Sequence, residues 1–206
     1  MNELEPMVFV VDDDDSVRKA MTRLIQSVGI KVECFASAEA FLLRQRYEGP
    51  GCLVLDIRMP GLSGLDLQEE LTKANLTLPI IFITGHGTIP MGVRAIKAGA
   101  IDFLEKPFED QALLDLIKHA FECDRWAKQE HAEKSGILQR FESLTPREQE
   151  VLALMVTGKL NKQVAIQLNI IEQTVKFHRA HVMEKMQAES LADLVRMSGI
   201  LPIRKA

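Results

Sequence analysis

Four consecutive carboxylates, residues 12–15, directly follow a short apolar run near the start of the chain. A second apolar run, 52–55, also ends in an acid, Asp56. If both runs are neighbouring strands of a parallel sheet, their carboxyl ends bring Asp12, Asp13 and Asp56 to one edge of it. Carboxylates that lie so close repel one another unless a hard cation lies between them. The three acids therefore predict a site for Mg2+, or for Mn2+, and with it phosphate chemistry.

Two further polar residues lie at the ends of apolar runs. Thr84 ends the fourth run, and Lys106 comes at the end of the fifth, before Pro107. A carboxylate nucleophile, a cation, a hydroxyl donor and an ammonium group are together what an acyl phosphate needs. In such a site Lys106 and the metal would neutralise phosphoryl oxygens, and Thr84 could donate to one of them.

An acidic run has a simpler interpretation, as a solvated loop or as the start of a helix, where carboxylates complement the exposed N–H groups and the dipole. We assign Asp14 and Asp15 to one of these structural roles. A single acid at the end of a strand is also more commonly a cap than a nucleophile. The chemical interpretation therefore depends on the combination of residues and not on Asp56 alone.

Residues 1–123 alternate between short apolar runs and helical periodicity, with glycines at the joins. The predicted strands are 7–11, 31–35, 52–55, 79–83 and 101–104, and the predicted helices are 15–27, 37–46, 64–73, 88–98 and 109–130. Strands that alternate with helices form βαβ units. We predict an α/β fold, a flavodoxin-like, doubly wound, five-stranded parallel sheet with its ligand at the carboxyl ends of the strands.

From residue 124 the sequence becomes polar, and we predict a linker over 124–142 that is at least partly helical. An open alternative is that the preceding helix continues as a short coiled coil. Leu138, Phe141 and Leu144 could then pack on either domain.

A second domain is expected at 143–206. Thr145, Pro146 and Glu148 form the signature of a helix N-terminus with a capping box. The predicted helices are 146–157, 161–168, 172–186 and 190–198, and Asn169 is expected to take a left-handed turn conformation. A short helix, a tight turn and a longer basic helix describe a helix-turn-helix within a small all-α, four-helix domain. A solvated basic helix in an ordinary helical bundle explains the periodicity equally well.

The composition bounds the class of protein. The 206 residues are 47% hydrophobic and 26% charged, as in ordinary globular domains. Residues 1–120 carry a net charge of −6 and residues 121–206 a net charge of +2, so the two parts are expected to bind different ligands. Cys34, Cys52 and Cys123 lack metal-ligand spacing, and no run is long enough to span a bilayer. We expect a cytoplasmic protein without a signal peptide or membrane contact.

Residues 7–120 resemble the receiver domain of two-component response regulators. The matching pieces are the Asp12–Asp13 pair, DIRMPG at 56–61, Thr84, and KPF at 106–108. The resemblance implies that Asp56 accepts phosphate from a sensor histidine kinase. It implies Mg2+ held by Asp13, Asp56 and the backbone carbonyl of Arg58, with Asp12 acting mainly through water.

The same resemblance implies a cis peptide bond between Lys106 and Pro107. It also implies that Thr84 and Phe103 form a switch pair, in which the hydroxyl moves toward the phosphate and the ring turns inward.

Residues 143–200 resemble the LuxR-type DNA-binding domain. The matching segments are LTPREQEVL at 144–152, NKQVA at 161–165 and TVKFHR at 174–179. The resemblance implies that 172–186 is the recognition helix and 190–198 a dimer-forming helix. It implies DNA contacts by Lys162, Thr174, Lys176 and His178, with Arg179 and Lys185 close behind.

Three features of this second domain depart from the pattern or leave its role open. His181 stands where the family usually has Asn, and Gln173 stands where Lys or Arg is common. The apolar residues of 190–198, Leu191, Leu194 and Val195, could belong to the core of the domain instead of to a dimer interface.

Receiver and LuxR-type output together are similar to response regulators of the FixJ/NarL group. This implies a regulator that is phosphorylated by a sensor kinase, forms a homodimer through residues 85–108, binds double-stranded promoter DNA and contacts RNA polymerase. The receiver would transfer phosphate only to its own Asp56, so no enzyme is expected. The alternatives are a DNA-binding regulator that needs no phosphorylation, and an aspartate-nucleophile phosphatase, which the missing second acid in Asp56-Ile57-Arg58 disfavours.

Overall fold

The structure, a computed structural model, describes residues 4–74, 76–85 and 89–203 of the chain. Thr88, with which one predicted helix begins, lies outside these residues. The chain divides into two compact units, Met1–Lys128 and Gln129–Ala206. No helix among the described residues is long and apolar enough to cross a membrane.

The first unit contains a five-stranded sheet in which every pairing is parallel. Its strands are β1 (Met7–Val11), β2 (Lys31–Phe35), β3 (Gly51–Asp56), β4 (Ile80–Thr84) and β5 (Asp102–Glu105). The strand order is β2-β1-β3-β4-β5. The order reverses direction between β1 and β3, which places a ligand-binding crevice at the carboxyl ends of these two strands. The predicted α/β fold and its five parallel strands are confirmed.

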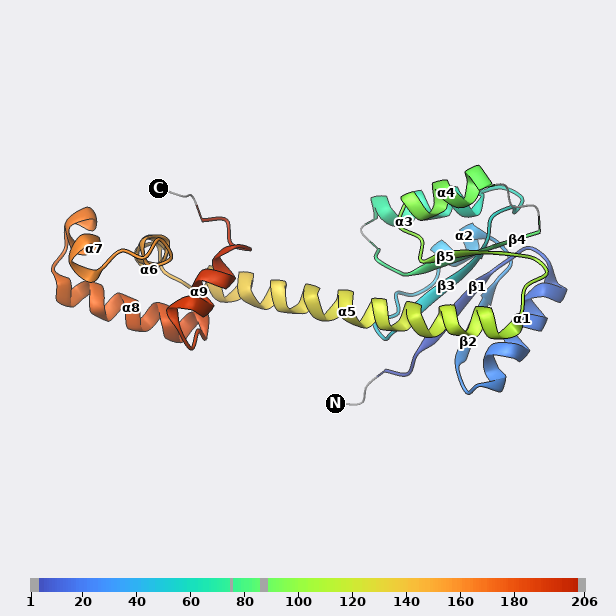
Figure 1. Cartoon of the computed structure of the whole chain (residues 1–206), viewed down its shortest axis with the longest axis horizontal. Helices are drawn as coiled ribbons and strands as arrows, with labels where there is room; N and C mark the ends of the chain where they lie inside the picture. The colour runs from blue at the N-terminus through green and yellow to red at the C-terminus, as the bar shows by residue number, and fades with distance from the viewer. Residues whose placement is uncertain (1–3, 75, 86–88, 204–206) are drawn as a thin grey trace. The chain divides into compact units, whose positions relative to one another are not determined.

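Helices cover both faces of this sheet (Figure 1). They are α1 (Asp15–Ser27), α2 (Ala38–Leu42), α3 (Gly64–Lys73), α4 (Ile89–Lys97) and the first part of α5 (Asp110–Glu142). Buried residues of α2, α3 and α4 share one core with Phe9, Leu53 and Phe82 of the sheet. Buried residues of α1 and α5 share the other core with Val10, Val54 and Ile83. Because strand side chains alternate between the two faces, β3 and β4 are buried along their whole length.

Helix α2 is shorter than the predicted 37–46. The chain leaves the helix at its C-cap, Leu43, and the guanidinium of Arg44 then stacks over the Phe41 ring, 3.8 Å from its centre. This cation–π contact also reaches the ring of Phe9. The local periodicity of residues 43–46 gives no sign of this long-range contact, so the predicted helix runs too far.

Helix α5 is longer than the predicted 109–130. It continues without a break to Glu142, so 124–142 is helical throughout. No proline interrupts the segment, and ion pairs at i,i+4 spacing, Lys128–Asp124 and Lys134–Glu130, support it. The helical character expected for 124–142 is present, and the expectation of a coiled coil stays a prediction.

The second unit is helical and contains α6 (Pro146–Met155), α7 (Asn161–Leu168), α8 (Glu172–Met186) and α9 (Leu191–Ser198). Thr145 caps α6 with the predicted capping box. Asn169, with φ of 53°, ends α7 in the left-handed conformation that the sequence predicts.

Three apolar residues at the end of α5 and just after it pack in the core of the second unit. Phe141 and Leu144 were candidates for this core, and Ile137, which was not predicted, packs there as well. On α9, Leu194 is buried, together with Met197, whereas Leu191 and Val195 are exposed. The apolar face of α9 is therefore divided between core and surface.

Candidate functional site

Three charged side chains meet at the carboxyl ends of β1, β3 and β5. Each of these charged residues comes two positions after a strand residue that packs in the core shared with α1 and α5. The three pairs are Val10 and Asp12, Val54 and Asp56, and Leu104 and Lys106. Because alternate residues of a strand point to the same face, the sequence aims all three charged groups at one spot.

Lys106 lies between the two acids. Its ammonium Nζ donates to Oδ2 of Asp12 at 2.7 Å and to Oδ1 of Asp56 at 2.9 Å. The second oxygen of Asp56 accepts the backbone N–H of Arg58 at 2.7 Å. The side chain of Asp56 retains 8% of its exposure and that of Lys106 retains 24%, so solvent reaches the site at this edge.

The environment shifts the pKa values of both Asp56 and Lys106. Burial raises the pKa of the Asp56 carboxyl, because a single ammonium opposes the loss of water while Asp12 adds a like charge. Burial alone would lower the pKa of Lys106, but hydrogen bonds to Asp12 and Asp56 outweigh it and raise the pKa. Asp56 is thus a more basic carboxylate than an exposed Asp, beside a cation that stays charged.

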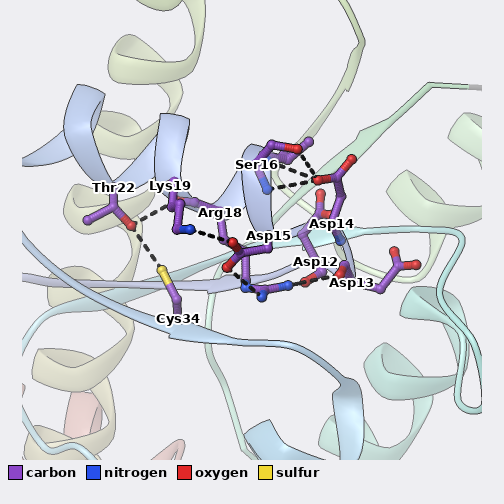
Figure 2. Close-up of polar contacts among 10 residues, drawn as sticks. Asp12, Asp13, Asp14, Asp15, Ser16, Arg18, Lys19, Thr22 and Cys34 are labelled. Carbon is purple, nitrogen blue, oxygen red and sulfur yellow. Dashed lines mark hydrogen bonds and ion pairs between the residues drawn. The ribbon is translucent and has the colours of Figure 1, made fainter.

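Asp13 does not join Asp12 and Asp56, contrary to the expected convergence of three acids. It follows Asp12 directly, so its side chain is directed away from the buried site and is exposed. Figure 2 shows the acidic segment, where Arg18 donates to the backbone carbonyls of Asp12 and Asp13 at 2.7 and 2.9 Å. Among the described residues, no three His, Cys, Asp or Glu side chains are arranged to hold a metal ion.

The donor set still suits a hard cation in its chemistry. Asp12 and Asp56 are carboxylates within reach of one ammonium, and oxygen ligands of this kind are those that Mg2+ prefers. The adjacent exposed Asp13 can change rotamer without disturbing any packed neighbour. The residue types therefore fit Mg2+. In this structure Asp12 and Asp56 are instead ion-paired with Lys106.

Asp14 and Asp15 have structural roles. Asp14 is the N-cap of α1, and its side chain accepts from the backbone N–H of Ser16 at 2.8 Å (Figure 2). Asp15 pairs with Lys19 at 2.6 Å. The expected role of these two acids as part of a helix start is confirmed.

Thr84 and Phe103 lie on the same face of the sheet. Phe103 is the register partner of Phe82 on β4, and Thr84 follows Phe82 by two residues. Thr84 is 1% exposed, and its carbonyl accepts the backbone N–H of Lys106 at 2.8 Å. Phe103 is partly buried against the core that includes α4. The predicted cis bond between Lys106 and Pro107 is present.

The second candidate site is the solvent-facing side of α8. Lys176 is exposed, whereas Thr174, His178 and Arg179 are only partly so. Arg179 reaches the carbonyl of Lys159 at 3.4 Å, and Nδ1 of His178 is buried without a partner among the described residues. Lys162, on α7, is exposed as well. Lysine groups that face solvent on both helices of a helix-turn-helix can reach DNA phosphates.

Lys185 differs from the other predicted DNA contacts. Its ammonium donates at 2.7 Å to Oε2 of Glu148, a side chain that is only 4% exposed. The same carboxylate oxygen accepts the backbone N–H of Thr145 at 2.8 Å. A phosphate would have to displace this pair, so Lys185 helps to pack α8 on α6, and its contact with DNA stays a prediction.

Sequence reasoning missed two residues near the sites. Arg18 orders the backbone of the acidic segment, and its signal was a basic residue one helical turn beyond the four acids. Phe177 is 58% exposed on α8, between Gln173 and Ala180 on the solvent-facing stripe. Helical spacing from the buried Val175 and Val182 would have placed it there.

Comparisons with known proteins agree with both halves of the chain. Residues 8–118 match the model of the response regulator receiver domain, and residues 142–198 match that of bacterial regulatory proteins of the luxR family. Nodulation protein W of Bradyrhizobium diazoefficiens is 54% identical over 96% of this chain and 87% of its own. The transcriptional regulatory protein FixJ of Rhizobium meliloti is 44% identical over 93% and 94%.

Solved structures agree as well. The response regulator StyR, at 51% identity, matches 96% of this chain and all of its own with a TM-score of 0.86. With a receiver fold that carries Asp12, Asp56 and Lys106 at one edge and a helix-turn-helix after it, the chain belongs to the family of two-component transcriptional response regulators with a LuxR-type DNA-binding domain.

Proposed function

We propose that a sensor histidine kinase phosphorylates this regulator on Asp56. The observation that carries the proposal is the position of Lys106, whose ammonium contacts Asp56 at 2.9 Å and Asp12 at 2.7 Å. A cation fixed beside a carboxylate of raised pKa favours charge build-up on a transferred phosphoryl group.

In the proposed transfer, one Asp56 oxygen attacks the phosphorus of a phosphohistidine. The O–P bond forms while the P–N bond to the kinase histidine breaks, and the histidine keeps the electron pair. Lys106 holds the new negative charge, and the Arg58 N–H keeps the Asp56 carboxyl in orientation. Thr84, at the end of β4, donates to a phosphoryl oxygen.

A divalent cation belongs to this proposal. Asp12, Asp13, Asp56 and the backbone carbonyl of Arg58 would hold Mg2+, or Mn2+. When bound, the metal supplies positive charge that neutralises phosphoryl oxygens. Receiver domains generally use Mg2+ at their phosphorylation site, and the carboxylates present here are of the type that binds it.

The response to phosphorylation is proposed to pass through Thr84 and Phe103 into the segment 85–108. Their position on one face of adjacent strands supports this coupling. The proposed homodimer surface includes Met91, Arg94, Ile96 and Phe103. Ile96 is 45% exposed on α4, so its side chain is accessible to a partner copy.

The output is proposed to be DNA binding by a two-fold dimer on two half-sites. Lys162, Thr174, Lys176, His178 and Arg179 would contact phosphates or bases in each half-site. The bound dimer would then act on RNA polymerase in the cytoplasm.

The test is DNase footprinting of genomic promoter fragments with the full-length chain. Acetyl phosphate with Mg2+ should strengthen protection, and EDTA should remove the gain. Asp56→Asn should bind DNA as the untreated protein does, with or without acetyl phosphate. Equal protection by wild type in all conditions would overturn the phosphorylation-dependent account and favour a constitutive DNA binder.

A further inference from the structure

Phe177 is a large apolar residue on the side of α8 that faces solvent. It follows the buried Val175 by two residues, or about 200° around an α-helix, so the two side chains point in nearly opposite directions. Val182 and Met186, which are also buried, lie on the side of Val175. Phe177 therefore projects away from the core of the second unit, and more than half of its surface is exposed.

The neighbours of Phe177 along this stripe leave much of the ring open. Gln173 precedes it by four residues and Ala180 follows it by three, and both are exposed. Side chains of a helix lean toward its N-terminus, so a long side chain at 180 would lie over the ring. Ala180 has only a methyl group, and the ring stays accessible to a large partner.

His181 supports the ring of Phe177 from one side. The two ring centres lie 4.1 Å apart, with their planes tilted by 57°. Nδ1 of His181 in turn lies 3.5 Å from Oε1 of Glu148, a buried side chain. A ring that is already packed against a neighbour loses less rotamer freedom when a ligand covers it. Phe177 is therefore an apolar contact whose orientation is set before binding.

Exposed apolar side chains occur singly on many protein surfaces, so exposure alone assigns no role to Phe177. Its place in the helix-turn-helix does. Phe177 lies in the second turn of α8, and the N-terminal residues of such a helix meet base edges in the major groove. The exposed Lys176 beside it has only a loose ion pair with Glu172, at 3.8 Å, and can turn to a phosphate.

The chemistry of the side chain selects the base. A phenyl ring neither donates nor accepts a hydrogen bond of the kind that base edges offer. The apolar feature of the major groove is the C5-methyl group of thymine, which the other three bases lack. Cytosine instead presents its N4 amino donor, and an apolar ring placed against that donor would remove water from it without replacing the hydrogen bond.

We propose that Phe177 determines specificity by contacting the C5-methyl group of one thymine in each half-site of the bound DNA. The inference rests on the proposed DNA-binding output, to which it adds a contact that reads sequence. Removal of one buried methyl group from such a contact should weaken binding about fourfold.

The first experiment selects bound duplexes from a random DNA library with the full-length chain, with and without acetyl phosphate and Mg2+. The wild-type protein should enrich sites with a thymine at one fixed position of each half-site. Phe177→Ala should lose the preference at that position and keep the others. Leu43→Ala, which removes an exposed apolar side chain from the first unit, should select the same sites as wild type.

The second experiment removes only the methyl group. Deoxyuridine replaces that thymidine in one half-site of the selected duplex, and affinities for the two duplexes are compared for each protein. Wild type should bind the deoxyuridine duplex about fourfold more weakly. Phe177→Ala should bind both duplexes equally, whereas Lys176→Ala should lose affinity for both and keep the wild-type ratio. Because the ratio compares two duplexes with one protein, it does not depend on phosphorylation at Asp56.

The possible failures are distinguishable. Enrichment of the same sites by wild type and Phe177→Ala, or a deoxyuridine effect that survives Phe177→Ala, would overturn the role of Phe177 and leave the DNA-binding output intact. A change of affinity in Phe177→Ala that is uniform over all sites would also overturn it, and would indicate that the ring contacts protein. A wild-type chain that enriches no site would contradict the DNA-binding output and this inference together.

Discussion

Lys185 of α8 donates to Oε2 of Glu148 of α6 across 2.7 Å, and this ion pair joins the two helices. His181 approaches the other oxygen of Glu148, with Nδ1 3.5 Å away. Glu148 also completes the capping box of α6 through the backbone N–H of Thr145. One buried carboxylate therefore fixes both the start of α6 and the position of α8.

Acid should weaken this connection. The Lys185 ammonium, together with the backbone of Thr145, lowers the pKa of Glu148 to about 2. Because the folded-state pKa lies below the ordinary value of 4.5, the stabilisation is present above pH 4.5 and is lost as the pH falls toward 2. The protection factors of the α8 amides, which compare their exchange with that of an unfolded chain at the same pH, should fall over that range.

Glu148→Gln should already be destabilised at pH 6, by about 1–3 kcal/mol, because the ammonium of Lys185 loses its charged partner. Its α8 exchange should then depend much less on acid than that of wild type. Glu150→Gln, at an exposed neighbour, is the control and should behave as wild type. A steep acid dependence retained in Glu148→Gln would show that another carboxylate is responsible.

Removal of the Lys106 charge should destabilise the first unit. Lys106→Met leaves Asp12 and Asp56 buried side by side without their shared cation, at a cost of roughly 1–3 kcal/mol at pH 7. The deficit should shrink as the pH falls, because the carboxylates then become protonated. In wild type the raised pKa of Lys106 means that its contribution is present below pH 10.5 and is lost as the pH rises through the folded-state pKa.

Urea unfolding followed at amides of β1 and β3 measures this effect. Lys97→Met removes an exposed lysine from the end of α4 and should leave the midpoint unchanged. A Lys106→Met protein as stable as wild type at neutral pH would mean that the two acids find another source of compensation.

Replacing Lys176 and replacing Lys185 should have different effects on the salt dependence of DNA binding. Lys176→Ala should reduce the slope of log K against log salt by about 0.9, the value for one phosphate contact. Lys185→Ala should leave the slope unchanged and lower the stability of α8 instead, because its ammonium is held by Glu148. A slope change in Lys185→Ala, with none in Lys176→Ala, would reverse the two assignments.

Gly136 offers a test of the continuous α5 helix. It lies inside the helix, and a Cβ built on it meets nothing within 4 Å. Gly136→Ala should therefore stabilise the chain by about 0.4–1 kcal/mol. Gly158 is equally uncrowded but has φ of 80°, so Gly158→Ala should destabilise by strain. If Gly136→Ala also destabilised the protein in thermal unfolding, the helix would not continue through 136 in solution.

Much of the first site follows from local patterns. Apolar runs with alternating faces place Asp12, Asp56 and Lys106 in register, because parallel strands end at a common edge. The same alternation applied to Asp13 would have turned it away from the other two acids, and the expectation of three converging carboxylates ignored it.

The remaining differences come from contacts between residues distant in sequence. The pairing of Lys185 with Glu148 joins positions 37 residues apart, and no helical spacing reveals it. Beyond the end of helix α2, Arg44 stacks on Phe41 of the same helix and on Phe9 of β1, and the contact with Phe9 lies outside its own sequence window. Asp124 of α5 likewise accepts the backbone N–H of Gly51 of β3, which joins positions 73 residues apart.

Intact-mass measurement after incubation with acetyl phosphate and Mg2+ tests the central claim, the assignment of Asp56, most directly. The wild-type protein should gain the mass of one phosphoryl group. Asp102→Asn, the control at an exposed acid of β5, should gain the same mass. Asp56→Asn should gain none. Labelling of Asp56→Asn at the wild-type level would contradict the account.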